Sequence, residues 1–271
     1  MPDSTDQEIS FPSGIPILMY HKIDSRNEVG INAVSPDRFE SHIHWLNSQG
    51  YQSITIKDME LDSHPEKPII LTFDDGYLSV YKHALPILQK YNMRGVVYAI
   101  SGFLGKHNTW DVNLGGITFL HLHAQALKEL QDLGWEIGAH TVTHRGLTLF
   151  NVHEIRRELS ESKESLESHL GKSIVSVAYP FGLCNSTVRD IANQAGFRYG
   201  CVCLRHGLGT SDRLMLPRIP VYQFDGTTQL EKKLRLKGSD FEYLKLRILS
   251  YPAIFTPWYQ KMFKRELVLD P

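Results

Sequence analysis

The sequence predicts an α/β fold in which about seven parallel strands are joined by helical crossovers. Short apolar runs alternate along the chain with longer segments of helical periodicity, which is the order that parallel strands require. The 271 residues are 42% hydrophobic and 22% charged, as is typical of a folded globular protein with a substantial core. Since no internal repeat or low-complexity stretch divides the chain, we expect one main domain followed by a tail.

Each predicted strand is a short, mainly apolar run bounded by polar or turn-forming residues. Runs of this kind suit buried strands of a parallel sheet. The seven runs are Ile15 to Tyr20, Ile69 to Phe73, Gly95 to Ile100, Trp135 to Ala139, Ile174 to Tyr179, Phe197 to Val202 and Arg218 to Tyr222.

Longer segments between these runs have helical spacing, and several carry helix-end signals. Ser35 followed by Pro36 is an N-cap residue with proline at the first helical position. Glycines at positions 50, 134, 171 and 196 stand where left-handed C-cap residues belong. The predicted helices are Pro36 to Asn47, Tyr77 to Tyr91, Ala124 to Leu133, Val152 to Leu170, Ser186 to Ala195 and Thr227 to Leu236.

Composition excludes several classes of protein. The formal net charge of −1 gives no global attraction to nucleic acid. Three cysteines, at positions 184, 201 and 203, are too few for a disulfide framework and are expected to be reduced. The first residues form no apolar signal segment, and no run of about 18 apolar residues occurs. We therefore expect a cytoplasmic protein, with the inner face of the membrane as an alternative location.

Polar residues follow four of the predicted strands at the point where each strand ends. In a parallel α/β barrel, the carboxyl ends of the strands form the edge where active sites are assembled. The sequence therefore predicts a catalytic site built from widely separated segments. Its candidate residues are His21, the pair Asp74 and Asp75, the pair His140 and His144, and the turn Pro180-Phe181-Gly182.

The motif H-T-V-T-H contains two histidines, His140 and His144, four positions apart. In an extended strand their rings would stand about 13 Å apart, at roughly 3.3 Å per residue, too far to share an ion. A helical turn after His140 would bring both rings onto one face, and Gly138 is compatible with such a bend. The spacing indicates a metal site only if the chain bends there; two ordinary surface or core histidines are the alternative.

Asp74 and Asp75 place two like charges side by side after a buried strand. A catalytic metal held by two histidines commonly takes a carboxylate as its third protein ligand. Adjacent residues at a strand end point in different directions, so one carboxylate can bind an ion while the other faces water. The cation would also make the two neighbouring charges tolerable. An ordinary Asp-Asp-Gly turn is the alternative.

T-F-D-D-G and H-T-V-T-H, in this order and at this separation, resemble the first two signatures of the polysaccharide deacetylases, the NodB-homology domain of carbohydrate esterase family four. The resemblance covers roughly Ile15 to Val221 and implies a distorted, NodB-like (β/α) barrel. It also implies that Asp74 is the general base. Asp75, His140 and His144 would bind one divalent metal ion, with zinc expected and cobalt or nickel suited to the same ligands.

The chain departs from the family pattern in its third signature. Ala178-Tyr179-Pro180-Phe181-Gly182 keeps the proline, aromatic residue and glycine but lacks the arginine. By the resemblance, the backbone N–H of Phe181 would donate to the oxyanion, a role that does not depend on the side chain. Arg218 is the candidate substitute for the missing arginine in orienting Asp74; an ordinary surface arginine is the alternative.

The last family signature, which supplies an acid histidine near the C-terminus, is missing from the final third of the chain. A similar stretch, I-L-M-Y-H, ends instead at His21. The chain is therefore similar to the circularly permuted branch that includes the poly-N-acetylglucosamine deacetylases. His21 would then be the catalytic acid, the alternative being a structural histidine that caps a strand. Such a permutation is harmless if the first and last strands are neighbours in a closed barrel.

The resemblance implies metal-assisted removal of an N-acetyl group from an acetamido sugar in a polysaccharide or a lipid-linked saccharide, with release of acetate. An O-acetyl esterase of the xylan type could use the same site. A catalytically silent carbohydrate-binding protein on this fold is a third possibility. The partner is expected to be this glycan, not nucleic acid, and the sequence does not predict an oligomeric state.

Three regions are expected: an N-terminal extension over residues 1–14, the catalytic domain over 15–225 and a basic helical tail over 226–271. The tail interleaves Lys and Arg with aromatic residues, which suits either peripheral contact with an anionic membrane or packing across the barrel. Trp110 is expected either in a sugar-facing loop or simply packed. Six histidines in or beside predicted helices are expected to face solvent: His42, His44, His121, His123, His153 and His169.

Overall fold

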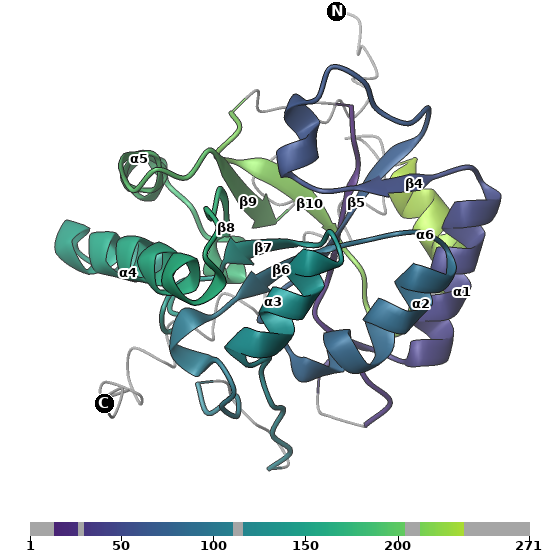
Figure 1. Ribbon diagram of the computed structural model, residues 1–271, viewed down its shortest axis with the longest axis horizontal. Helices are drawn as coiled ribbons and strands as arrows, with labels where there is room; N and C mark the ends of the chain where they lie inside the picture. The colour runs from purple at the N-terminus through teal and green to yellow at the C-terminus, as the bar shows by residue number, and fades with distance from the viewer. Residues whose placement is uncertain (1–13, 27–29, 111–115, 204–211, 236–271) are drawn as a thin grey trace, which may run out of the picture.

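Seven parallel strands close into a barrel that is surrounded by helices (Figure 1). The computed structural model describes residues 14–26, 30–110, 116–203 and 212–235. Around the barrel the order is β1-β10-β9-β8-β7-β6-β5, and β5 pairs back with β1. The barrel strands are β1 (Ile17–Tyr20), β5 (Pro68–Phe73), β6 (Val96–Ala99), β7 (Glu136–Ala139), β8 (Ser176–Ala178), β9 (Tyr199–Cys203) and β10 (Leu216–Pro220).

Closure depends on β1, the first strand of the chain. It lies between β10, with Leu18 opposite Ile219, and β5, with Leu18 opposite Leu71. The first and last strands are therefore neighbours, as a permuted chain requires. All seven predicted strands are present, and the predicted α/β barrel of parallel strands is confirmed.

Three further strands were not predicted. β4 (Gln52–Ile54) pairs with the first half of β5, and β6 pairs with the second half of β5 along the same edge. β2 (Lys22–Ile23) and β3 (Ala33–Val34) form a separate parallel pair. Elements of two or three residues are too short to show the alternation from which strands are recognised.

The helices cover the outside of the barrel. In Figure 1, α1, α2 and α6 lie on one side, α4 and α5 lie on the opposite side, and α3 lies between them in front. Their bounds are α1 (Pro36–Ser48), α2 (Leu85–Lys90), α3 (Ala124–Asp132), α4 (Val152–Leu170), α5 (Ser186–Gln194) and α6 (Thr227–Leu234).

The predicted helix ends are confirmed by capping contacts. The Ser35 side chain accepts a hydrogen bond from the backbone N–H of Arg38. Asn151 and Glu154 form a reciprocal capping box at the start of α4, and Gly171 ends that helix with a φ of 66°. The segment predicted as one helix over Tyr77 to Tyr91 differs, because a π-helical turn, η2 (Val80–Ala84), precedes α2. Pro86 has no amide hydrogen for the regular α-helical bond in that turn.

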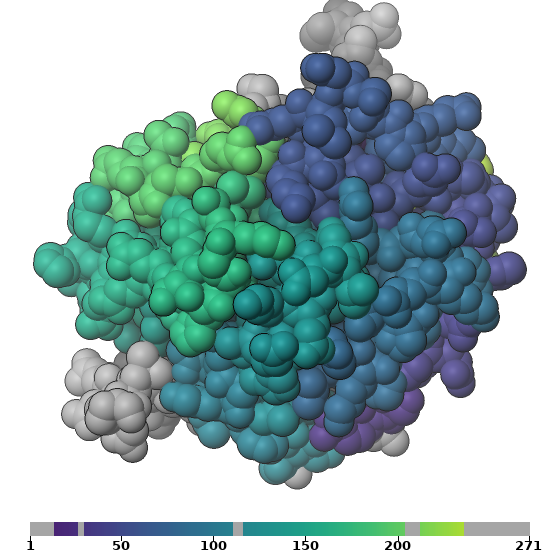
Figure 2. All heavy atoms as spheres, in the orientation of Figure 1, coloured from purple at the N-terminus to yellow at the C-terminus, as the bar shows by residue number. Residues whose placement is uncertain are grey.

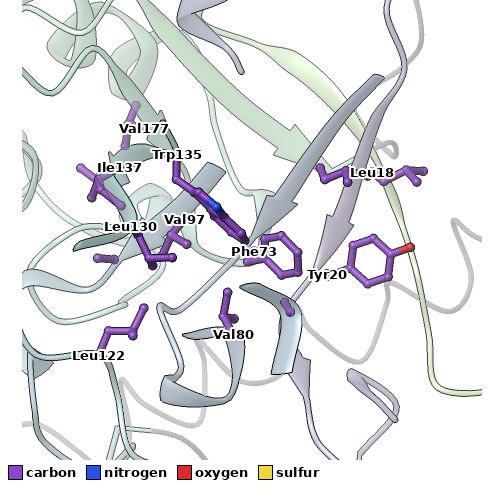
Figure 3. Close-up of a cluster of buried hydrophobic side chains, with 14 of the residues drawn as sticks. Leu18, Tyr20, Phe73, Val80, Val97, Leu122, Leu130, Trp135, Ile137 and Val177 are labelled. Atoms are coloured by element: carbon purple, nitrogen blue, oxygen red, sulfur yellow. The ribbon is translucent and has the colours of Figure 1, made fainter. Parts of the chain in front are cut away.

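The apolar core has two parts, on the two faces of the strands. The outer part packs between strands and helices, where Phe73, Val97 and Trp135 meet Leu130 and Val80 (Figure 3). The rings of Phe73 and Trp135 lie 5.6 Å apart. The inner part fills one end of the barrel with side chains that alternate with the outward-facing ones: Ile17, Ile70, Val96, Tyr199 and Leu216 among others. This alternation fixes which residues reach the barrel's interior.

Segments from the first and the last third of the chain also meet on the surface. Glu60 accepts ion-pair contacts from Arg198 at 2.5 Å and from Arg213 at 3.3 Å. Figure 2 shows this junction as an early segment, in blue, adjoining a late segment, in green. α6, the first part of the predicted basic tail, packs against α1, and its Lys233 is buried with its ammonium group against Asp225.

Other predictions about the chain ends fall outside the structure. Residues 1–13 of the predicted N-terminal extension and residues 236–271 of the predicted tail lie outside the described residues. The division into three regions therefore stays a prediction. In the part of the chain that the structure describes, no helix combines the length and the apolar character needed to cross a bilayer.

Candidate active site

The candidate site continues the inward-facing rows of the strands past their carboxyl ends. Thr72 faces the interior near the end of β5, and Asp74 comes two residues later. Gly138 occupies the same place on β7, and His140 follows two residues later. A Cβ at Gly138 would lie 2.4 Å from the ring of Tyr98, so this glycine permits close packing inside the barrel and does not form the bend after β7.

Asp75, His140 and His144 converge on one point. The Oδ1 atom of Asp75 lies 3.4 Å from Nε2 of His140 and 3.2 Å from Nε2 of His144. All three side chains are buried, and theirs is the only group of such residues in the described ranges that could hold a metal ion. The predicted ligand set is thus brought together by strand ends that lie far apart in the sequence.

The chemistry of these atoms fits a cation. Nδ1 of His140 lies 2.7 Å from the carbonyl oxygen of Ala178, and because a carbonyl only accepts, Nδ1 must carry the hydrogen. In the neutral ring Nε2 then presents a lone pair toward Asp75. Oδ1 of Asp75 is itself buried without a hydrogen-bond partner. A divalent ion would satisfy an oxygen and nitrogens that otherwise face one another as acceptors.

The backbone adopts unusual conformations at the site. Five non-glycine residues of the described chain have positive φ, and four of them lie here: Asp75 (68°), Thr141 (65°), His144 (56°) and Phe181 (58°). The chain bends after His140, as a shared metal site would require, but the bend is not the helical turn considered from the sequence. The segment is a loop in which Thr141 and His144 take the left-handed conformation, and the two rings approach to 4.8 Å between centroids. Strained residues of this kind tend to cluster at functional sites.

Asp74 is held by Arg218 from β10. Nη1 of Arg218 lies 2.6 Å from Oδ1 of Asp74, and Nη2 lies 2.7 Å from Oδ2, so the guanidinium grips the carboxylate with two parallel hydrogen bonds. Nη1 also donates to the Thr72 hydroxyl at 3.1 Å. Arg218 is 1% exposed, which excludes the alternative of an ordinary surface arginine.

The electrostatic surroundings of the two aspartates differ, and so do the causes of their pKa shifts. Burial alone would raise the pKa of Asp74, but the Arg218 guanidinium outweighs it and lowers that pKa. Burial likewise opposes ionisation of Asp75, and the two histidines lower its pKa. Burial lowers the pKa of His144 to about 3, which keeps that ring neutral. The pKa of His140 is raised, because the carboxylates of Asp74 and Asp75 outweigh its burial.

His21 and Phe181 lie at the edge of the group. His21 follows β1 and is partly exposed; burial lowers its pKa, although the nearby charges of Asp75 and Asp74 act in the opposite direction. Phe181 lies in the short helix η5 (Pro180–Gly182), and its ring meets that of His144 edge to face at 4.8 Å between centroids. Gly182 is required there because a Cβ would lie 2.4 Å from Sγ of Cys203.

The sequence analysis missed the contact of His121 with the site, and of its two alternatives for Trp110 the structure supports packing. His121 is 1% exposed, and its Nδ1–H donates to the backbone carbonyl of Asp75 at 2.8 Å. The indole N–H of Trp110 donates to Nε2 of His121 at 3.1 Å, and the indole lies 3.9 Å from the ring of His144. Trp110 is therefore packed behind a candidate metal ligand. His121 and His42 are buried, contrary to the prediction that they face solvent. Neither the spacing nor the neighbours of His121 in the sequence signal this contact.

The comparison with protein families decides the classification. The family model described as polysaccharide deacetylase matches residues 62–200, a span of more than half the chain. The chain belongs to the polysaccharide deacetylase family. This match contains both T-F-D-D-G and H-T-V-T-H.

Relatives and solved structures agree with this family. YxkH of Bacillus subtilis, a protein named for the same family, is 32% identical over 210 residues, which cover 75% of this chain and 69% of YxkH. The poly-beta-1,6-N-acetyl-D-glucosamine N-deacetylase of Staphylococcus aureus (strain MRSA252) is 28% identical over 189 residues, which cover 65% of this chain and 63% of the enzyme. The Streptococcus pyogenes deacetylase PplD, solved in complex with acetate, matches with a TM-score of 0.68 and 26% identity over 82% of this chain and 98% of PplD. PplD supports the closed, NodB-like barrel of seven parallel strands.

Proposed function

We propose that this polysaccharide deacetylase is a metal-dependent hydrolase that removes an N-acetyl group from an acetamido sugar, in a polysaccharide or a lipid-linked saccharide, and releases acetate. The observation that carries the proposal is the pair of adjacent carboxylates with separate partners. Asp75 faces two imidazoles in a group suited to a metal ion, while Asp74 stays outside that group, held by Arg218. This arrangement supports the assignment of Asp75 as a metal ligand and of Asp74 as the base.

Asp75, His140 and His144 would hold the ion, and zinc is the proposed metal. When bound, a divalent ion supplies a Lewis acid that polarises an acyl oxygen and acidifies water. The residues of the chain supply the proton transfers. Asp74 is ionised because its pKa is lowered, so its carboxylate can accept a proton from the attacking water.

The remaining groups act on the acetamide. The backbone N–H of Phe181 donates to the oxygen that becomes negatively charged when water adds to the carbonyl carbon. The new C–O bond forms as the water's proton passes to Asp74, and the C–N bond then breaks. The departing nitrogen takes a proton from His21, whose protonated form is favoured by the charges of Asp75 and Asp74 against its burial. Acetate and a free amino sugar result. His21 stands at the partly exposed edge of the site, where a leaving sugar would be released.

The Staphylococcus aureus relative favours a polymer of N-acetylglucosamine as substrate, since its name states that activity. The chain spans 63% of that enzyme's length, so the likeness does not extend to the whole of it. An O-acetyl esterase remains the competing proposal, because the same groups would attack an ester. Acetate release from N-acetylglucosamine oligomers and from acetylated xylan, measured side by side, separates the two activities.

The proposed function is tested with the full-length protein and Asp74→Asn. We expect metal analysis to find about one divalent ion per chain, and chelation to abolish acetate release until zinc is restored. Asp74→Asn should retain the metal while turnover falls by roughly 10²–10⁴-fold, the usual contribution of a general base. Native rates in this variant would contradict the assignment of Asp74, and acetate release that survives complete removal of metal would contradict the metal-dependent mechanism.

A further inference from the structure

Glu158 is a buried acid on the inner face of α4. Its neighbours in that buried row include Ile155, Leu159 and Leu166, and Glu158 is 2% exposed. A carboxylate on an apolar helix face is unfavourable unless hydrogen bonds replace its lost water. Its partners therefore indicate why an acid occupies this position.

Glu158 accepts three hydrogen bonds from the segment between His140 and His144. Oε2 accepts from the backbone N–H groups of Val142 and Thr143, both at 2.9 Å. Oε1 accepts from the Thr143 hydroxyl at 2.6 Å. An ionised carboxylate is an acceptor only, so it suits three donors that converge from one short loop.

The rest of this loop is fixed from its other side. The backbone N–H of Ser101 donates to the carbonyl of Thr141 at 3.1 Å, and that of Gly102 donates to the carbonyl of Val142 at 3.0 Å. The Thr141 hydroxyl accepts from the backbone N–H of His144 at 3.1 Å. The loop belongs to no helix or strand, so these bonds replace the regular ones that would otherwise satisfy its backbone.

We propose that Glu158 is a positioning residue for the metal centre: it holds the loop so that His140 and His144 both face Asp75. The left-handed conformations of Thr141 and His144 persist only if the surroundings enforce them, and Glu158 binds Val142 and Thr143, two of the three residues between the histidines. This inference rests on the proposed metal-dependent function. It adds a residue that touches neither the ion nor the substrate.

Zinc affinity of the full-length protein, measured by competition with a chromophoric chelator, tests the proposal. Glu158→Met keeps the side-chain length but removes all three acceptor contacts, and should weaken zinc binding by roughly 10–100-fold, as loss of an outer-shell partner does. Glu158→Gln can accept from both N–H groups and donate to the Thr143 hydroxyl, so its zinc affinity should be close to native. Glu161→Met, on the exposed face of α4, is the matched control and should bind zinc as the native protein does.

Thermal unfolding of each metal-free variant, followed by circular dichroism, separates positioning from general stabilisation. If Glu158→Met does not fold, Thr143→Val removes only the hydroxyl contact and should show a smaller loss of zinc affinity. A folded Glu158→Met with native zinc affinity overturns the proposal, as does a folded Thr143→Val with native affinity when Glu158→Met cannot fold. A native protein that binds no zinc overturns it as well. Native protein that binds zinc but releases no acetate would contradict the proposed function and leave the role of Glu158 standing.

Discussion

The adjacent carboxylates of Asp74 and Asp75 have different partners because their backbone conformations differ. Asp74 continues the inward-facing row of β5 and reaches Arg218, whereas Asp75 has a φ of 68° and turns toward His140 and His144. The guanidinium balances the charge of Asp74. The charge of Asp75 is left facing imidazole nitrogens, which is the arrangement that attracts a divalent cation.

The contact between Arg218 and Asp74 leads to a prediction. Arg218→Lys keeps a positive charge but loses the planar pair of donors, so Asp74 would no longer be fixed in orientation. We expect kcat for acetate release to fall by roughly 10²-fold, within the range of general-base contributions, with little change in KM. Steady-state kinetics on an N-acetylglucosamine oligomer, with zinc content measured in parallel, provides the check. Unchanged kcat in a zinc-loaded variant would show that Arg218 only packs the barrel.

The sequence predicted the candidate metal ligands better than the residues that hold those ligands in place. Asp75, His140 and His144 stand in short motifs whose spacing carries chemical meaning, so they could be found without coordinates. His121, Trp110 and Glu158 act through contacts made only after folding, and their neighbours in the sequence signal nothing of the kind. Arg218 lies between these cases, because a missing arginine in one motif prompted the search for another.

At the scale of elements, predictions succeeded where apolar periodicity is strong. The barrel strands and the six helices follow from runs of buried residues, and glycines end helices at the expected positions. The loop over residues 140–144 could not be predicted, because its left-handed residues are held by contacts from α4 and from Ser101 and Gly102. Its three central residues, Thr141, Val142 and Thr143, are β-branched and give no strong local preference for a helical turn, so tertiary contacts set its conformation.

Close packing inside the barrel leads to a second prediction, at Gly138 on β7. A Cβ there would lie 2.4 Å from the Tyr98 ring and 2.8 Å from the Ser176 hydroxyl, so Gly138→Ala should destabilise the protein by about 1–3 kcal/mol through overpacking. Gly171→Ala is the comparison: its added Cβ meets nothing within 4 Å, but its φ of 66° is left-handed, and a loss of about 1–2 kcal/mol is expected. Urea unfolding measures both. Native stability for Gly138→Ala would mean that Tyr98 and Ser176 can shift to accommodate the added methyl group without cost.

The basic tail is the subject of a third prediction. Lys233 in α6 is buried against Asp225 and the Pro220 carbonyl, so it serves the fold and must be excluded from any surface that binds lipid. Residues 236–271 lie outside the described chain, and their alternation of basic and aromatic residues is the basis for expecting membrane contact. Full-length protein should float with anionic vesicles, and a chain ending after Arg235 should not. Equal flotation of the two proteins would rule out the tail as the contact.

At the scale of the whole molecule, barrel closure gives the two ends of the strands different characters. The end near Ile17, Ile70 and Leu216 is lined mainly by apolar side chains, with Glu136 and Ser176 as a buried polar pair among them. Toward the carboxyl ends the interior becomes polar, first with Thr72 and Arg218 and then with the candidate site. Since β1 stands between β10 and β5, His21 comes to the same edge as Asp74 although 53 positions separate them in the chain. The permuted order of motifs is thus compatible with one compact site.

The barrel interior also holds Glu136, whose ionisation links the stability of the whole fold to pH. Its Oε1 accepts from the Ser176 hydroxyl at 2.6 Å and its Oε2 accepts from the backbone N–H of Lys57 at 2.8 Å, but burial outweighs these bonds and raises its pKa above 4.5. Above pH 4.5 the unfolded chain releases this proton while the folded chain retains it. The native protein therefore loses stability as the pH rises toward the folded pKa.

Glu136→Gln should remove this loss, because a glutamine has no proton to release and can still pair with both partners: its carbonyl accepts from Lys57 and its amide donates to Ser176. We expect the variant to have a higher free energy of unfolding than the native protein at about pH 8. The difference should shrink toward about pH 5, where Glu136 is protonated to a more similar extent in the folded and unfolded states of the native protein. Urea unfolding at the two pH values measures this difference, with the exposed Glu161→Gln as control. If the native protein matches Glu136→Gln at both pH values, the buried carboxyl group does not oppose folding, and the hydrogen bonds from Ser176 and Lys57 must compensate fully for its burial.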